Sequence, residues 1–280
     1  MKKGLTKSLS LFILAGLMVS CEDENLNINA ANQFVVEAFI FANEPVDDVK
    51  IKTTFPLVDT EDTSSPINNA EVVLIKDDDR YHLQSINNDG FYGYPGGDLT
   101  VNQDDVFQLE VTHDGIVATA ETTVPEPTTG LELSKSEIII PKIGFGGITD
   151  GDEIRTIIQN STIEITWDSD SDDLFYAVIK TIEDELDPIF PAQVADRLRQ
   201  FEFISEPTRN NSITFQGIQI ESYGIHSVKV YRINEEYAAL FDNQEQDSRD
   251  LNEPPSNVRN ALGVFSAFNS QEVFFDVRRN

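Results

Sequence analysis

Three aspartates alternate in the acidic stretch DSDSDD, namely Asp168, Asp170 and Asp172. Alternating carboxylates of this kind are hard oxygen ligands that suit calcium. The pattern of a calcium-binding loop nevertheless fails at its sixth position, which is Asp173 rather than Gly, and at its twelfth, which is Ile179 rather than Glu. A solvated loop between two strands is therefore the favoured interpretation, and the three aspartates are weak candidates for a calcium site.

The three histidines, His82, His113 and His226, lie too far apart in the sequence to show a ligand spacing. His226 alternates in phase with Val228 and Val230, which predicts a core position. His113 precedes a turn signal and is expected in solvent. The sequence contains no Gly-x-Ser-x-Gly, His-Glu-x-x-His or Cys–His arrangement, so we expect no catalytic residues and no enzymatic activity.

The single cysteine, Cys21, stands between an apolar run and three acids. Three lysines near the start of the chain precede a mainly apolar stretch at 9–19. That stretch is too short for a membrane-spanning helix, which needs roughly 20 apolar residues. It is typical of the apolar region of a secretory signal, which is removed on maturation.

The stretch Met18-Val19-Ser20-Cys21 resembles a bacterial lipobox, with Met18 where leucine is usual. The resemblance implies that residues 1–20 are a removed signal peptide and that the thiol of Cys21 carries a covalent lipid. Residues 21–32 are then a lipidated tether. A plain secreted protein with a chance cysteine is the alternative.

The acids Glu22, Asp23 and Glu24 resemble the surface-export signal of Bacteroidota lipoproteins. This resemblance implies a lipid-anchored protein of the outer membrane that faces the cell exterior. A solvated tether is the alternative interpretation of the same three residues.

The chain is strongly acidic. Lys and Arg total 20 and Asp and Glu total 49, which gives a formal net charge of -29 at pH 7. Such a surface repels nucleic acid, which we exclude as a partner. Hydrophobic residues make up 40% of the chain and include 18 Phe, so there is material for a core without disulfides.

The apolar period beyond the tether is two, which predicts strands. We expect an antiparallel β-sandwich at 33–124, with tight turns at Asp89-Gly90 and Asp114-Gly115. The Pro- and Thr-rich residues 125–130 predict a linker. A second sandwich is expected at 131–280.

Several features are expected within the second sandwich. Trp167 should be buried, and the change of phase at Gly217 predicts a β-bulge. Asn234 is a suitable N-cap, so a helix is expected at 235–242, and a second helix is possible at 191–201. The stretches LGVFSAF and EVFFDV near the C-terminus predict a hairpin.

Three aromatic residues group near a turn of the first sandwich: Phe91, Tyr92 and Tyr94. Aromatic faces can grip sugars and peptides. Such side chains alternate into a sandwich core equally well, and a core position is the favoured interpretation.

Longer stretches support a family resemblance. The first part of the chain resembles a transthyretin-like or carboxypeptidase-regulatory-like sandwich. The stretches that carry this resemblance are PINNAEVVLI, NNDGFYGY and DVFQLEVTHDGIVATAET. The stretch STIEITWDSDSDDLFYAVIKT resembles part of a fibronectin type III domain. Residues 253–277 resemble the closing segment of certain Bacteroidota lipoproteins. The chain is identified as similar to domain of unknown function family 4249, which has no established catalytic residues.

The resemblance implies a mainly β protein with two Ig-like or transthyretin-like sandwiches and one or two short helices in the second. It also implies a role beside a TonB-dependent outer-membrane receptor. On this interpretation the protein is an accessory of the transport system that acts by protein contact or substrate capture. A surface protein that binds glycan, peptide or divalent metal by itself is the alternative.

Overall fold

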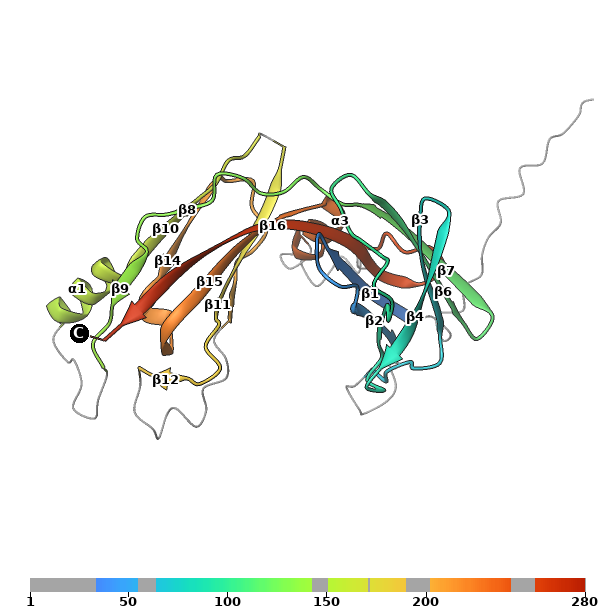
Figure 1. Ribbon diagram of the computed structural model, residues 1–280, viewed down its shortest axis with the longest axis horizontal. Coiled ribbons are helices and arrows are strands. Elements are labelled where there is room, and N and C mark those ends of the chain that lie inside the picture. Colours follow the sequence, from blue (N-terminus) through green and yellow to red (C-terminus); the bar gives the residue numbers. More distant parts are fainter. Residues whose placement is uncertain are drawn as a thin grey trace, which may run out of the picture.

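The computed structural model describes residues 34–54, 64–142, 151–170, 172–189, 202–242 and 255–279. The protein is mainly β, as predicted, and has two lobes (Figure 1). The expected signal and tether, the lipidation site and the possible helix at 191–201 lie outside the described residues. None of the helices within those residues is long and apolar enough to cross a membrane.

The first lobe is built from seven strands. They are β1 (Phe34–Phe41), β2 (Asp48–Thr53), β3 (Glu71–Lys76), β4 (Asp79–Ile86), β5 (Phe91–Gly93), β6 (Val106–His113) and β7 (Ile116–Thr123). The predicted turn between β6 and β7 is confirmed, because Asp114 and Gly115 have φ angles of 49° and 80°. Positive values at both central residues match the right-handed twist of the flanking strands.

The other described elements make up the second lobe and its junction with the first (Figure 1). They are β8 (Glu132–Leu133), β9 (Glu137–Ile139), α1 (Gly151–Ser161), β10 (Thr162–Thr166), β11 (Leu174–Thr181), β12 (Asp187–Pro188), β13 (Glu202–Ile204), β14 (Ser212–Gln216), η2 (Gly217–Gln219), β15 (Ser222–Ile233), α3 (Glu235–Asp242) and β16 (Leu262–Arg278). The helix predicted at 235–242 is confirmed as α3, whereas α1 was not expected. The predicted β-bulge at Gly217 is wrong, since a 3₁₀ turn, η2, connects β14 to β15.

The predicted C-terminal hairpin is also wrong. The two apolar stretches form one continuous strand, β16, which runs from one lobe into the other (Figure 1). Its first part pairs with β1 from Val35↔Leu262 to Phe41↔Phe268, and its second part pairs with β15 from Asn269↔Arg232 onward. Because each part has a partner strand and residues 269–271 have no positive φ angle, the chain stays extended where a turn was expected.

The strands form one large sheet and one small sheet. The order in the large sheet is β13-β11-β15-β16-β1-β2-β5-β4-β3-β6-β7, and the small sheet is β14-β10-β8. The large sheet is mixed rather than purely antiparallel, because β16 pairs in parallel with both β1 and β9.

Each lobe has a separate apolar core. The core of the second lobe includes Trp167, which is 3% exposed. His226 is also buried and stacks on Phe275 of this core, so both predicted burials are confirmed. The core of the first lobe is completed from the far end of the chain by Phe265 and Ala267 of β16. The segment 131–280, which we expected to form one domain, therefore contributes to both cores.

Candidate functional site

The junction of the lobes has two different sides. Side chains of a strand alternate between the faces of its sheet, so neighbours on β16 point in opposite directions. Asn269 and Gln271 meet the connecting segment 125–131, whereas Phe268 meets a cluster of aromatic rings.

The connecting segment is bound by hydrogen bonds along its length. Asn269 donates from Nδ2 to the carbonyl oxygen of Pro125 at 2.9 Å, and the Leu131 amide donates to Oε1 of Gln271 at 3.0 Å. Between them, Thr128 donates from its buried hydroxyl to the carbonyl oxygen of Val230 at 2.9 Å. Because β15 and β16 hold both ends and the middle, the segment is part of the fold and fixes one lobe against the other.

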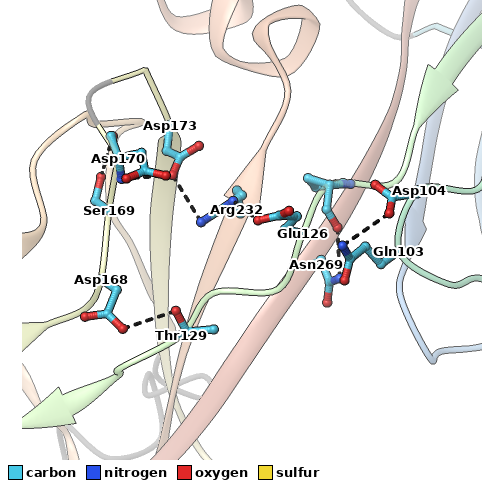
Figure 2. A network of polar contacts seen from close by, with 11 residues as sticks. Gln103, Asp104, Glu126, Thr129, Asp168, Ser169, Asp170, Asp173, Arg232 and Asn269 are labelled. Carbon is cyan, nitrogen blue, oxygen red and sulfur yellow. Dashed lines mark hydrogen bonds and ion pairs between the residues drawn. The ribbon is translucent and has the colours of Figure 1, made fainter.

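Arg232 lies at the centre of the polar contacts on this side (Figure 2). Its guanidinium pairs with Glu126 at 3.2 Å and with Asp173 at 3.1 Å, and it lies 5.5 Å from the ring centre of Phe175. A cavity of about 240 Å³ opens beside it, with a mainly polar lining that includes Asn234. Both carboxylates pair with the same cation, so the arrangement links the connecting segment to the loop before β11.

The acidic loop that suggested calcium is arranged around these contacts. The Asp168 carboxylate accepts a hydrogen bond from the Thr129 hydroxyl at 3.2 Å, and the Asp170 amide donates to Oδ2 of Asp173 at 3.1 Å. Figure 2 shows Asp168 directed toward Thr129, away from Asp170 and Asp173. Within the described residues no three His, Cys, Asp or Glu side chains are grouped so that they could hold a metal ion.

Aromatic side chains cover the opposite side of the junction. We define the aromatic face by six residues from five elements: Phe39 and Phe41 of β1, Tyr176 of β11, Tyr231 of β15, Tyr237 of α3 and Phe268 of β16. Phe268 is 1% exposed and contacts the other five rings, at centroid distances from 4.9 to 6.2 Å. The other rings, except Tyr176, are partly exposed, so the face combines a sealed centre with an accessible rim.

Charged groups surround this face. Lys229 pairs with Glu44 at 2.9 Å, and its Nζ atom lies 5.7 Å from the ring centre of Tyr231. Asp48 is the register partner of Phe39, and burial raises the pKa of its carboxyl, with Asp47 adding to the rise.

Burial also raises the pKa of Tyr176 far above its usual range. The neighbouring Tyr237 and Tyr231 add to this rise, followed by the charges of Asp48 and Glu202. Since Asp48 belongs to β2 and Glu202 to β13, carboxylates from both lobes act on the same hydroxyl group.

The other residues singled out from the sequence lie elsewhere. Cys21 and the acids at 22–24 are outside the described residues. Tyr92 is 2% exposed, and its hydroxyl donates to the carbonyl oxygen of Ile67 at 2.9 Å, which confirms a core position. Phe91 and Tyr94 are partly buried.

The expectation that His113 is in solvent is wrong. Its ring packs edge-on against Phe34 at 5.9 Å and its side chain is only 17% exposed, whereas His82 is exposed. A residue before a tight turn can still point inward, because strand alternation and not distance from the turn decides its face.

Sequence reasoning missed the aromatic face. One signal was present: AFIF at 38–41 and LFYAVI at 174–179 are apolar on both faces of their strands. Such runs indicate a strand that is covered on both sides. The two runs could not show which residues cover the second face of each strand. Those residues come from β15, β16 and α3, which are distant in the sequence.

The fold and the junction define a class of two-lobed, mainly β proteins in which one strand serves both lobes. Residues 22–273 match the family described as domain of unknown function (DUF4249), and the chain belongs to that family. A search of the curated proteins finds no match.

Among solved structures, the chain is similar to a crystal structure of domains A168-A170 from titin. The identity is 12% and the TM-score is 0.21, and the match covers 72% of this chain and 60% of that chain.

Proposed function

We propose that this chain is a Bacteroidota lipoprotein, held to the outer membrane by fatty chains on Cys21 and facing the cell exterior. The observation that carries the proposal is the order of residues around Cys21, with the apolar stretch 9–19 and lipobox-like residues 18–20 before it and the acids 22–24 after it. Each buried CH₂ contributes only about 0.8 kcal/mol, so a stable anchor needs more than one chain. A multiply acylated cysteine meets this requirement.

In that location, the folded body acts as a non-enzymatic accessory of a TonB-dependent transport system. It contacts the receptor or captures the substrate that the receptor imports. Support comes from the lipobox-like motif and from a body whose lobes are fixed to each other by β16 and the connecting segment. A body of fixed shape loses little conformational freedom when it binds.

Mass spectrometry of the protein from its natural host tests the anchor. We expect an N-terminal peptide that begins at Cys21 and carries acyl chains. A Cys21→Ser variant is the matched control and should retain residues 1–20 without acylation. A bare thiol at Cys21, or an attached leader in the unaltered protein, would contradict the proposal.

Protease treatment of intact cells tests the orientation. The unaltered protein should be digested, whereas a variant with Glu22→Gln, Asp23→Asn and Glu24→Gln should stay acylated but become protected. If the unaltered protein is fully protected while a known surface protein is digested, the outward orientation is wrong.

Gentle solubilisation followed by co-purification tests the accessory role. We expect one TonB-dependent receptor to be retained by the tagged protein and lost when the tag is carried by an unrelated lipoprotein. The aromatic face favours a second candidate, a surface protein that binds its ligand without a receptor. Ligand-dependent thermal stabilisation together with absence of any receptor would support that candidate instead.

A further inference from the structure

The small sheet ends in an edge strand, β14, whose outer backbone groups the fold does not use. The Trp167 amide donates to the carbonyl oxygen of Asn211 at 3.0 Å, and the register continues from there into β14. Backbone groups alternate in direction along an antiparallel strand, so those of Ile213 bond toward β10 while those of Ser212 and Thr214 point away from it. No described residue bonds to the N–H or C=O groups of Ser212 and Thr214.

The other ends of the described sheets are protected. At β7 the Arg259 amide donates to the carbonyl oxygen of Thr119 at 2.8 Å, and the Thr119 amide donates back at 3.2 Å. Strands β8 and β13 have only two and three residues, and each carries a glutamate, Glu132 and Glu202. Covered, short or charged edges are the common protection against pairing with another chain. The edge at β14 is not protected in this way, since residues 210–220 contain no charged side chain and no proline.

Apolar side chains are partly open on the inner side of this edge. Ile213 points into the core of the second lobe, because its register partner Ile165 is fully buried there, but Ile213 itself is only partly buried. The ring of Phe203 on β13 packs on Phe215 at 5.3 Å and is also only partly buried. A strand added to the edge would therefore gain apolar contacts on its inner side as well as hydrogen bonds to β14.

The outer side of the small sheet is acidic. Glu164 is the register partner of Thr214 and is exposed on the same face. Glu132 of β8 is exposed on that face too, since its partner on β10, Thr166, is two residues from Glu164. Neither glutamate forms an ion pair with a described residue, and the ammonium group of Lys135 is bonded instead to two backbone carbonyl oxygens of α1. The outer face beside the edge therefore favours positive charge in a strand that pairs with β14.

We propose that β14 accepts an extended segment of another protein as an additional antiparallel strand, and that this segment alternates basic and apolar residues. Residues of the segment opposite Ser212 and Thr214 exchange backbone hydrogen bonds with them, and their basic side chains lie on the face of Glu164. The apolar residues between them point inward, to Ile213 and Phe203. A second copy of this chain fits the edge less well, because pairing of two such edges would bring acidic faces together between chains of formal net charge -29.

This inference concerns the folded body alone and does not depend on the lipid anchor or on a transport partner. Fluorescence anisotropy of the labelled peptide Val-Lys-Val-Lys-Val, with blocked termini, tests it on the purified full chain. We expect binding with an affinity that falls as salt is added.

Two methylated peptides test whether the peptide binds as a strand. In the proposed pairing the lysine N–H groups face β14 and the valine N–H groups face solvent. N-methylation of both lysines should therefore weaken binding by about tenfold or more. N-methylation of two valines is the matched control, because charge and side chains are the same, and it should weaken binding by less than about threefold.

Variants of the chain locate the site. Thr214→Pro removes the N–H group that faces outward, and proline is tolerated in an edge strand where this group faces solvent. Binding should fall by about tenfold, whereas Thr214→Val keeps the N–H group and should bind within about twofold of the unaltered protein. Glu164→Gln tests the charge of the outer face and should weaken binding by about twofold to threefold at low salt.

Four results would overturn the proposal. The first is an absence of binding by the unmodified peptide, and the second is equal binding of the two methylated peptides, which would show attraction by charge alone. The third is equal binding to Thr214→Pro and Thr214→Val; if Thr214→Pro does not fold, the methylated peptides decide without it. The fourth is a dimer of the unaltered chain that dissociates in Thr214→Pro, measured by sedimentation, which would assign the edge to a second copy.

Discussion

The two lobes differ in where along the chain their core residues lie. The second core lies within one stretch of chain, from Leu131 to Val277. The first core combines strands from residues 34–124 with Phe265 and Ala267, which come from the far end of the chain. One strand, β16, thus closes the first lobe with its first half and belongs to the second lobe with its second half.

The difference shows that a lobe boundary in space need not be a boundary in sequence. The first lobe cannot bury Phe34 and its neighbours fully until the segment after residue 258 has been added. Contacts between residues as distant as Val35 and Leu262 are slow to form, since a long loop must first be closed. The lobes should therefore unfold together, and Phe268 at their junction should hold them together.

Truncation of Phe268 should have the largest effect on this coupling. Phe268→Ala removes the ring at the centre of the aromatic face and should lower the free energy of unfolding by about 3–5 kcal/mol. Urea unfolding is followed by circular dichroism, which reports both lobes, and by the fluorescence of Trp167, which reports only the second.

The two signals should coincide in the unaltered protein and separate in the variant. Phe274→Ala is the matched control, because Phe274 lies on the same face of β16 but is 50% exposed. Separate transitions in the unaltered protein would show that the lobes are not coupled at all.

A methyl group at Gly263 should damage the first lobe. Gly263 has a φ angle of 119°, and an added Cβ would lie 1.9 Å from the backbone oxygen of Val36. Gly263→Ala must therefore push β16 away from β1, and the free energy of unfolding should fall by about 2–3 kcal/mol.

The control for this change is Gly97→Ala, since no atom lies within 4 Å of the Cβ position there. If the lobes are coupled, Gly263→Ala also shifts the unfolding transition that Trp167 fluorescence reports, although Trp167 lies in the other lobe. A shift confined to circular dichroism would refute coupling through β16.

Loss of Arg232 should have a smaller effect. Arg232→Gln leaves Glu126 and Asp173 without their shared cation, and the free energy of unfolding should fall by about 1–2 kcal/mol. Arg80→Gln removes a more exposed pair with Glu110 and should cost about 0.5 kcal/mol. Thermal melts of the two variants at equal salt compare them. Equal losses would show that the polar side of the junction contributes no more than an ordinary surface pair.

The smallest effect concerns pH and is confined to the second lobe. Burial lowers the pKa of His226 from 6.5, against the smaller opposing influences of the Gly224 carbonyl and the Glu183 and Asp276 charges. The unfolded chain therefore takes up this proton first as the pH falls. His226 contributes its full stability above pH 6.5 and loses it as the pH drops below that value.

Denaturation midpoints measured at pH 7.5 and at pH 5.5 give the slope of stability against pH. The slope should be shallower in His226→Phe and unchanged in His82→Gln, whose histidine is exposed. An unchanged slope in His226→Phe would assign the acid sensitivity to other groups.

The sequence predicted local structure well wherever a local signal exists. The turn at Asp114-Gly115 and the helix that follows Asn234 depend on backbone preferences of a few neighbouring residues, and both are present. The phase change at Gly217 was located correctly but assigned to the wrong structure. A 3₁₀ turn and a bulge shift the apolar phase in the same way, so the pattern alone cannot separate them.

The course of β16 and the aromatic face could not be predicted, for a related reason. Asn269 and Ser270 occur in turns as readily as in strands, and only the partner strands β1 and β15 decide between these structures. Likewise, Phe39 and Tyr176 meet through elements that are far apart in the chain. Pattern reasoning identifies the face of a strand but not what lies against it.

The parallel pairing of β1 with β16 has a mechanical consequence. The chain enters β1 at Phe34, and the last strand starts beside it and leads away into the other lobe. Tension between the entry point and the distal tip therefore acts along these two strands. It loads their seven register pairs in shear, all at once, rather than peeling them apart one after another. A force applied at the start of β1 would therefore meet resistance at the first strand that it loads.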